Sequence, residues 1–110
     1  MDTADLRALV RFEEGDVVRS TVFESERLWA QLVCVDRNRS YGPVSDQSAD
    51  AVFVVIAGEA VLMVDRRRKR MGQWGAVLVP AGAQASATNA SAEPLVLLVI
   101  TAPPPGAGSG

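Results

Sequence analysis

The chain has 110 residues, a formal net charge of −2, 48% hydrophobic residues and no histidine. Its length predicts one domain with a self-sufficient core, and its acidity argues against a general electrostatic grip on nucleic acid. The absence of histidine excludes imidazole metal ligands, Ser-His or Cys-His nucleophile pairs and an imidazole general base from within the chain.

No apolar run approaches the length of a membrane span, so no contact with a membrane is expected. The first residues carry acids early and lack a long apolar run followed by a cleavage site, so nothing resembles a secretory signal. We therefore expect a soluble, cytoplasmic protein. The single cysteine, Cys34, lies in an apolar stretch and is expected to be a small buried hydrophobe, with a reactive thiol as the alternative.

The first part of the chain predicts a short N-terminal segment followed by a β-hairpin. Within segment 1–16, the apolar side chains between Thr3 and Phe12 favour a short helix or a turn. Val17 to Phe23 and Arg27 to Asp36 are rich in β-formers and predict two strands joined at residues 24–26. The second of these strands is apolar on both faces.

The middle of the chain predicts a connection, a long strand and a charged hairpin. Arg37 to Pro43 is predicted as a polar connection, and Val44 to Ala57 as strand with a break near Ser48. Ala60 to Val64 returns as a strand after a glycine turn. Asp65 to Arg70 is predicted as the charged tip of the hairpin.

The last part of the chain predicts three further strands. Ala76 to Val79 leads into a Pro-Ala-Gly corner, Ala83 to Asn89 is small and polar enough to line a cavity, and Leu95 to Thr101 is strongly apolar. The Pro/Gly-rich tail, residues 103–110, is predicted to be disordered.

Two strands are apolar at consecutive positions rather than at alternating ones, namely Val52 to Ile56 and Leu95 to Ile100. In an antiparallel sheet this pattern indicates that both faces are covered. One face can fill the interior, and the other needs a second layer or a partner subunit. We therefore expect a homodimer.

The order of strands and turns from Val17 to Thr101 resembles the cupin superfamily of small β-barrels. Pro80, Gly82 and Asn89 fall in register with the second cupin motif, and Gly58 anchors the first. The resemblance implies an all-β, single-domain, antiparallel cupin-type barrel, a double-stranded β-helix or jelly roll, over residues 1–102.

In metal-binding cupins the two motifs supply three histidines and one glutamate. The residues at those positions here are Ser45, Gln47, Ala51 and Ala85. None offers imidazole, thiolate or carboxylate, so no metal and no other cofactor is expected. A shifted site built from Asp46 and Asp50 is conceivable, but both aspartates are better interpreted as solvated residues near the rim.

The register of the resemblance implies a cavity with small walls. The candidate ligand-binding residues are Ser45, Gln47, Ala51, Phe53, Ala85, Trp29, Gln31 and Tyr41. Either the cavity accepts a small, partly apolar molecule, with Ser45 and Gln47 as its polar groups, or Trp29 and Phe53 close the space. Gln31 is expected to satisfy a local hydrogen bond, and Tyr41 either donates at the cavity mouth or packs over the core.

Five consecutive basic residues, Arg66 to Arg70, are a natural place to look for a phosphate contact. No aromatic residue interleaves them to stack bases, and a charged hairpin commonly blocks aggregation at the edge of a sheet. No nucleic-acid partner is expected.

Three functions follow from these observations. The first is a metal-free cupin that binds a small, partly apolar molecule as a sensor, carrier or accessory protein. The second is a metal-independent isomerase or cyclase, which needs a general base. The candidate bases are Asp46, Asp50, Glu59, Cys34 and Tyr41. The third is a structural dimerisation domain. The first is preferred, and no catalytic residue is assigned.

Overall fold

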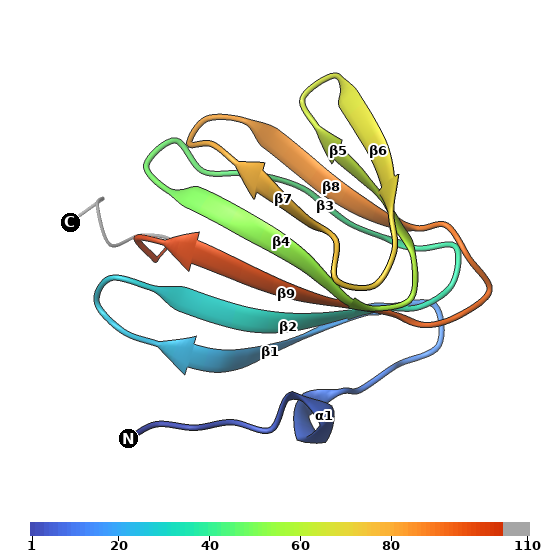
Figure 1. Cartoon of the computed structure of the whole chain (residues 1–110), viewed down its shortest axis with the longest axis horizontal. Helices are drawn as coiled ribbons and strands as arrows, with labels where there is room; N and C mark the ends of the chain where they lie inside the picture. The colour runs from blue at the N-terminus through green and yellow to red at the C-terminus, as the bar shows by residue number, and fades with distance from the viewer. Residues whose placement is uncertain (105–110) are drawn as a thin grey trace.

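The computed structural model describes residues 1–104, and these form almost entirely antiparallel β-structure (Figure 1). Within these residues one short helix, α1 (Leu6–Leu9), precedes nine strands. The strands are β1 (Val17–Glu24), β2 (Trp29–Val35), β3 (Ser40–Ser45), β4 (Asp50–Ala57), β5 (Ala60–Val64), β6 (Arg67–Met71), β7 (Ala76–Val79), β8 (Gln84–Asn89) and β9 (Leu95–Ala102).

The strands form two sheets that pack as a jelly roll, which confirms the predicted all-β fold class. One sheet has the order β1-β2-β9-β4-β7, and the other has the order β3-β8-β5-β6. In Figure 1 the five-stranded sheet fans out from β1, and α1 and the β5–β6 hairpin lie at opposite ends of the molecule. Within residues 1–104 no strand ladder joins the two sheets, so the expected barrel is a sandwich with open edges.

The main hydrophobic core lies between the two sheets. Phe53 and Val55 enter it from β4, and Ala85 and Ala87 enter it from β8, because alternate residues of a strand point to the same face. The ring of Tyr41 packs against that of Phe53 with their centroids 5.7 Å apart. Along these two strands, large residues of β4 therefore stand opposite small residues of β8 across the core.

A second cluster covers part of the outer face of the five-stranded sheet. Leu32, Cys34 and Val96 are buried there, and Leu6 and Leu9 of the α1 segment pack against them. The expected short N-terminal helix is thus confirmed. It covers part of the apolar surface for which the sequence pattern predicts a second layer or a partner subunit. The side chain of Asp5 accepts a hydrogen bond from the Arg7 amide at 3.0 Å and caps this helix.

The predicted connection over Arg37 to Pro43 is wrong, because its second half belongs to strand β3. β3 is an edge strand that pairs with β8, and its register shifts between Tyr41 and Val44. A proline lacks the N–H that a regular ladder needs, and it is tolerated at a bulge on a sheet edge. The predicted break near Ser48 is a turn at which the chain passes from one sheet to the other.

The predicted charged tip over Asp65 to Arg70 is also wrong. The turn contains only Asp65 and Arg66, and the basic residues continue as strand β6, paired with β5. β6 ends the four-stranded sheet, so its side chains reach solvent along the free edge. Such an edge accepts consecutive charges, which also oppose pairing with another chain.

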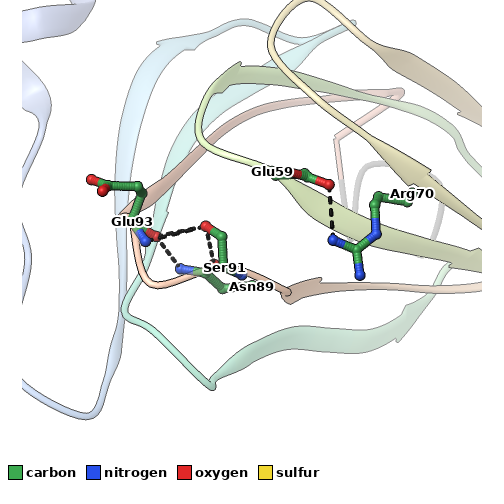
Figure 2. Close-up of polar contacts among 5 residues, drawn as sticks. All are labelled: Glu59, Arg70, Asn89, Ser91 and Glu93. Atoms are coloured by element: carbon green, nitrogen blue, oxygen red, sulfur yellow. Dashed lines mark hydrogen bonds and ion pairs between the residues drawn. The ribbon is translucent and has the colours of Figure 1, made fainter.

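The loop before β9 is held by Asn89, the asparagine of the second motif. Its Nδ2 donates to the carbonyl oxygens of Val35, at 3.1 Å, and of Glu93, at 2.8 Å. Its Oδ1 accepts from the amide of Ser91 at 3.1 Å. Figure 2 shows Asn89 reaching across the loop to Ser91 and Glu93, with the ion pair of Glu59 and Arg70 close by.

The polypeptide leaves the sandwich where β9 ends at Ala102. Of the tail predicted to be disordered, residues 105–110 lie outside the described part of the chain. No helix in residues 1–104 is long and apolar enough to cross a membrane.

Candidate functional site

A cavity of about 210 Å³ opens between the two sheets at one end of the sandwich. Its lining includes three alanines, namely Ala49, Ala51 and Ala83. Phe53, which is almost completely buried, also lines it. Because small side chains stand where larger ones could fill the space, the interior here is open rather than fully packed.

The polar centre of the cavity is a buried pair formed by Gln31 and Tyr41. Gln31 Nε2 donates to the Tyr41 hydroxyl at 3.3 Å, and the two residues are only 4% and 6% exposed. Because the hydroxyl oxygen accepts this bond, the hydroxyl proton is available to another acceptor. The local hydrogen bond expected for Gln31 is therefore present, and it leaves a donor beside the cavity.

Burial raises the pKa of the Tyr41 hydroxyl, while the nearby Arg19 charge and the Gln31 hydrogen bond lower it by less. The phenol is therefore protonated at neutral pH and acts as a hydrogen-bond donor or acid rather than as a base. The ring of Tyr41 packs on Phe53, and Tyr41 lines the cavity while its hydroxyl accepts a hydrogen bond from Gln31.

Two residues of opposite charge stand at the mouth. Arg19 comes from the edge strand β1, where its pairing with buried Val33 places it on the interior side of the sheet. Asp46 follows β3, and its Oδ1 accepts from the Ser48 amide at 2.8 Å. Asp46 is thus engaged in its own turn, whereas Arg19 is exposed and can reach a ligand.

Trp29, the first residue of β2, lines the same cavity. Its indole Nε1 donates to Thr21 Oγ1 at 3.0 Å, which fixes the orientation of the ring. Thr101 of β9, which is mostly buried, lines the cavity on the same sheet and pairs with Trp29.

The structure brings six of the eight sequence-predicted residues to this cavity. These are Ser45, Ala51, Phe53, Trp29, Gln31 and Tyr41. Gln47 is instead exposed in a turn beside Gly82, and Ala85 is buried in the core opposite Val44.

Ser45 lines the mouth but does not face the interior as its expected register implied. It pairs with exposed Gln84, while its neighbour Val44 pairs with buried Ala85 and packs on the core. The register shift in β3 exchanges the two faces, because one extra residue inverts the alternation of the side chains.

Arg19 is the main cavity residue that sequence reasoning missed. The alternation of Val17 and Arg19 in β1 is a usable signal, since both pair with interior residues of β2. Thr101 and Ala49 were also missed, and no short motif marks either of them.

The residues at the four metal-ligand positions do not fit a metal ion. Ala51 and Ala85 have no donor atom, and Ser45 and Gln47 are exposed. Within residues 1–104, no three His, Cys, Asp or Glu side chains gather in a way that could hold a metal ion. No step of chemistry through a metal is therefore derived for this cavity.

Of the five candidate general bases, Tyr41 and Asp46 line the cavity. Asp50 accepts a hydrogen bond from the Ala81 amide at 2.8 Å, and Glu59 pairs with Arg70. Cys34 is buried in the outer cluster, where burial raises the pKa of its thiol. If the protein is a metal-independent enzyme, the candidate bases at the cavity are therefore the Tyr41 phenol and the Asp46 carboxylate, which caps its own turn.

Solved structures with the same architecture span nearly the whole chain. TT1209 from Thermus thermophilus is 31% identical, with a TM-score of 0.90 over 96% of this chain and 100% of that one. A Klebsiella pneumoniae protein described as having a double-stranded beta-helix domain is 18% identical, with a TM-score of 0.86 over 94% and 90% of the two chains. A cupin superfamily protein from Desulfitobacterium hafniense is 21% identical, with a TM-score of 0.78 over 88% and 86%.

No protein-family model matches the sequence, and no curated protein matches it either.

Proposed function

We propose that this chain, whose fold is that of cupin and double-stranded beta-helix proteins, binds a small, partly apolar molecule between its sheets, as a cytoplasmic sensor, carrier or accessory protein. The observation that carries the proposal is the buried Gln31–Tyr41 pair, which presents a hydroxyl donor to a cavity with alanine walls. A few polar groups in an otherwise apolar pocket are typical of small-molecule sites.

The size and the charge of the cavity define the ligand further. Its volume of about 210 Å³ is below the roughly 300–1,000 Å³ of pockets for drug-sized ligands, so we expect a single-ring or short-chain molecule. Tyr41 supplies a proton and Arg19 a positive charge, so the polar end of the ligand should be an acceptor, such as a carboxylate. Its apolar part would contact Ala51 and Phe53.

Benzoate is a suitable probe, with benzylamine as a control of the same shape and the opposite charge. We expect benzoate to change the fluorescence of Trp29 saturably in a Trp74→Phe background, and benzylamine to have no such effect. Tyr41→Phe removes only the hydroxyl and should weaken benzoate binding at least several-fold. Arg39→Gln, a charge change away from the cavity, should leave it unchanged.

Native mass spectrometry of the purified protein tests the same proposal without a chosen probe. A bound small molecule that is lost in Tyr41→Phe would support a ligand cavity. The proposal is wrong if no small molecule co-purifies and millimolar benzoate gives no saturable signal in the wild-type protein.

A further inference from the structure

A groove on the open side of the sandwich combines basic and apolar side chains, and we propose that it binds an amphiphilic carboxylate, that is, an acyl chain with an anionic head group. The groove lies between β6 and β7, each of which ends one of the two sheets. Its volume is about 780 Å³, within the range of small-molecule sites, and it shares only Pro80 with the cavity described above.

The apolar floor of the groove is an extension of the main core. Leu62 is almost fully buried, and Val64, Met71 and Val77 pack against the core while also lining the groove. These four side chains come from β5, β6 and β7, so both sheets contribute. An acyl chain laid along them would bury apolar surface that the unclosed edge leaves in contact with water.

The strand register places two cations on the same side as this floor. Arg67 pairs with Val64, and Lys69 pairs with Leu62. Residues directly opposite each other in an antiparallel pair project to the same face of the sheet. Arg67 and Lys69 therefore start from the core-facing side of β6 and can reach over the groove with their long side chains.

The cations of the groove have no acidic partner in the described part of the chain. Among residues 1–104 there is one ion pair, between Glu59 and Arg70 at 2.9 Å. The acid of the groove, Asp65, accepts a hydrogen bond from the Gln84 amide at 3.0 Å and belongs to the hairpin turn. The excess of positive charge favours an anionic head group.

The same set of residues disfavours a nucleic acid. No aromatic side chain in residues 1–104 lines the groove, so bases would have no ring to stack on. A fully polar anion would bind the cations but leave the apolar floor exposed to water. An acyl carboxylate satisfies both parts of the groove at once.

Isothermal titration with dodecanoate below its micelle concentration tests the proposal. We expect saturable binding that strengthens about fourfold for each methylene between octanoate and dodecanoate, until the groove is filled. Dodecyltrimethylammonium, with the same chain and the opposite charge, should bind at least tenfold more weakly.

Matched variants locate the binding site. The double variant Arg67→Gln/Lys69→Gln should weaken dodecanoate binding at least tenfold. The control Arg37→Gln/Arg70→Gln removes the same charge outside the groove and should bind as the wild type does. Arg19→Gln, at the cavity, should also retain binding, which separates this site from the proposed small-molecule cavity. Circular dichroism and thermal unfolding confirm that each variant is folded.

Several results would overturn the proposal. These are equal binding of the cationic amphiphile, no effect of Arg67→Gln/Lys69→Gln, or loss of binding only in Arg19→Gln. Capture of a strand-forming acidic peptide in place of dodecanoate would instead assign the groove to a protein partner. Sedimentation with phosphatidylglycerol vesicles without binding of free dodecanoate would assign it to a membrane surface.

Discussion

At the scale of single residues, Asn89 connects the sandwich to its longest turn with one amide group. It is 2% exposed and bonds to β2, to Glu93 and to Ser91. Asn89, the asparagine of the second cupin motif, does not line the cavity. Its role in this chain is therefore structural. The same holds for Gly58, whose φ of +86° and contact with the Pro94 carbonyl leave no room for a side chain.

Asn89→Ala should lower the free energy of unfolding by about 2–4 kcal/mol, because two carbonyl oxygens lose their donor in a buried setting. Urea denaturation measures this change. Gln84→Ala, an exposed position on the same strand, is the control and should change stability by less than about 0.5 kcal/mol. Equal stability of Asn89→Ala and the wild type would contradict the structural role.

The thiol of Cys34 predicts a dependence of stability on alkaline pH. Burial raises its pKa in the folded protein, so the unfolded chain loses the proton first as the pH rises. The stabilisation is complete below the ordinary thiol pKa of about 8.5 and is lost as the pH rises through the folded value. Stability should therefore fall above about pH 8.5.

Urea denaturation of the wild type and of Cys34→Ala, from pH 7 to pH 10, checks this prediction. Cys34→Ala should be less stable at pH 7 but should show a shallower decline. Tyr41 adds to the decline near pH 10 in both proteins, since burial raises its pKa as well. Parallel pH profiles for the two proteins would contradict a buried thiol.

At the scale of elements, most strands could be predicted because runs of β-forming residues are bounded by turn residues. β1, β2, β5, β7, β8 and β9 follow this pattern. β3 and β6 could not be predicted, because the Gly-Pro pair in β3 and the run of cations in β6 normally indicate loops. Both are compatible with a strand only because β3 and β6 lie at the edges of their sheet.

The residues of the candidate site could be predicted only on strands whose register is regular. Phe53 and Ala51 lie on a regular strand, so the register that the cupin resemblance implies holds there and both residues line the cavity. Ser45 follows the register shift in β3, and Gln47 lies in a turn, so the expected alternation fails for both. Arg19 was missed because a cation on a strand ordinarily indicates the solvent face, although its alternation with Val17 indicates the interior side.

The α1 segment carries its own prediction. Leu6 and Leu9 are partly buried against the outer cluster, so Leu6→Ala/Leu9→Ala should lower the free energy of unfolding by about 1–3 kcal/mol. Thermal or urea unfolding measures the change. Val10→Ala, at a neighbouring exposed position, is the control. Unchanged stability of the double variant would show that this segment does not protect the sheet.

At the scale of the whole molecule, the α1 segment covers only one part of the outer face. Over β4 and β9, residues Val52, Val54 and Leu98 are partly buried, while Leu78 of β7 is 60% exposed and Trp74 beside it is 72% exposed. Large exposed apolar side chains on an otherwise well-packed sheet are typical of an interaction surface. We propose that a second copy of the chain covers this face, as a homodimer.

Leu78→Asp should shift the protein from dimer to monomer, because the interface would then bury an unpaired carboxylate. Size-exclusion chromatography with light scattering, over a hundredfold range of concentration, measures the mass. Ser25→Asp, at an exposed position in the β1–β2 turn, is the control and should remain dimeric. A monomeric wild type at every concentration would contradict the homodimer.

The position of β9 has a consequence for how the chain is made. β9 is the central strand of its sheet and pairs with β2 on one side and β4 on the other, yet it is the last of the nine strands to be synthesised. Until it leaves the ribosome, the β1–β2 pair and the β4–β7 pair have no shared neighbour. The larger sheet therefore cannot be completed before Leu95–Ala102 has been synthesised, and a product cut short before Leu95 lacks the strand that joins β2 to β4.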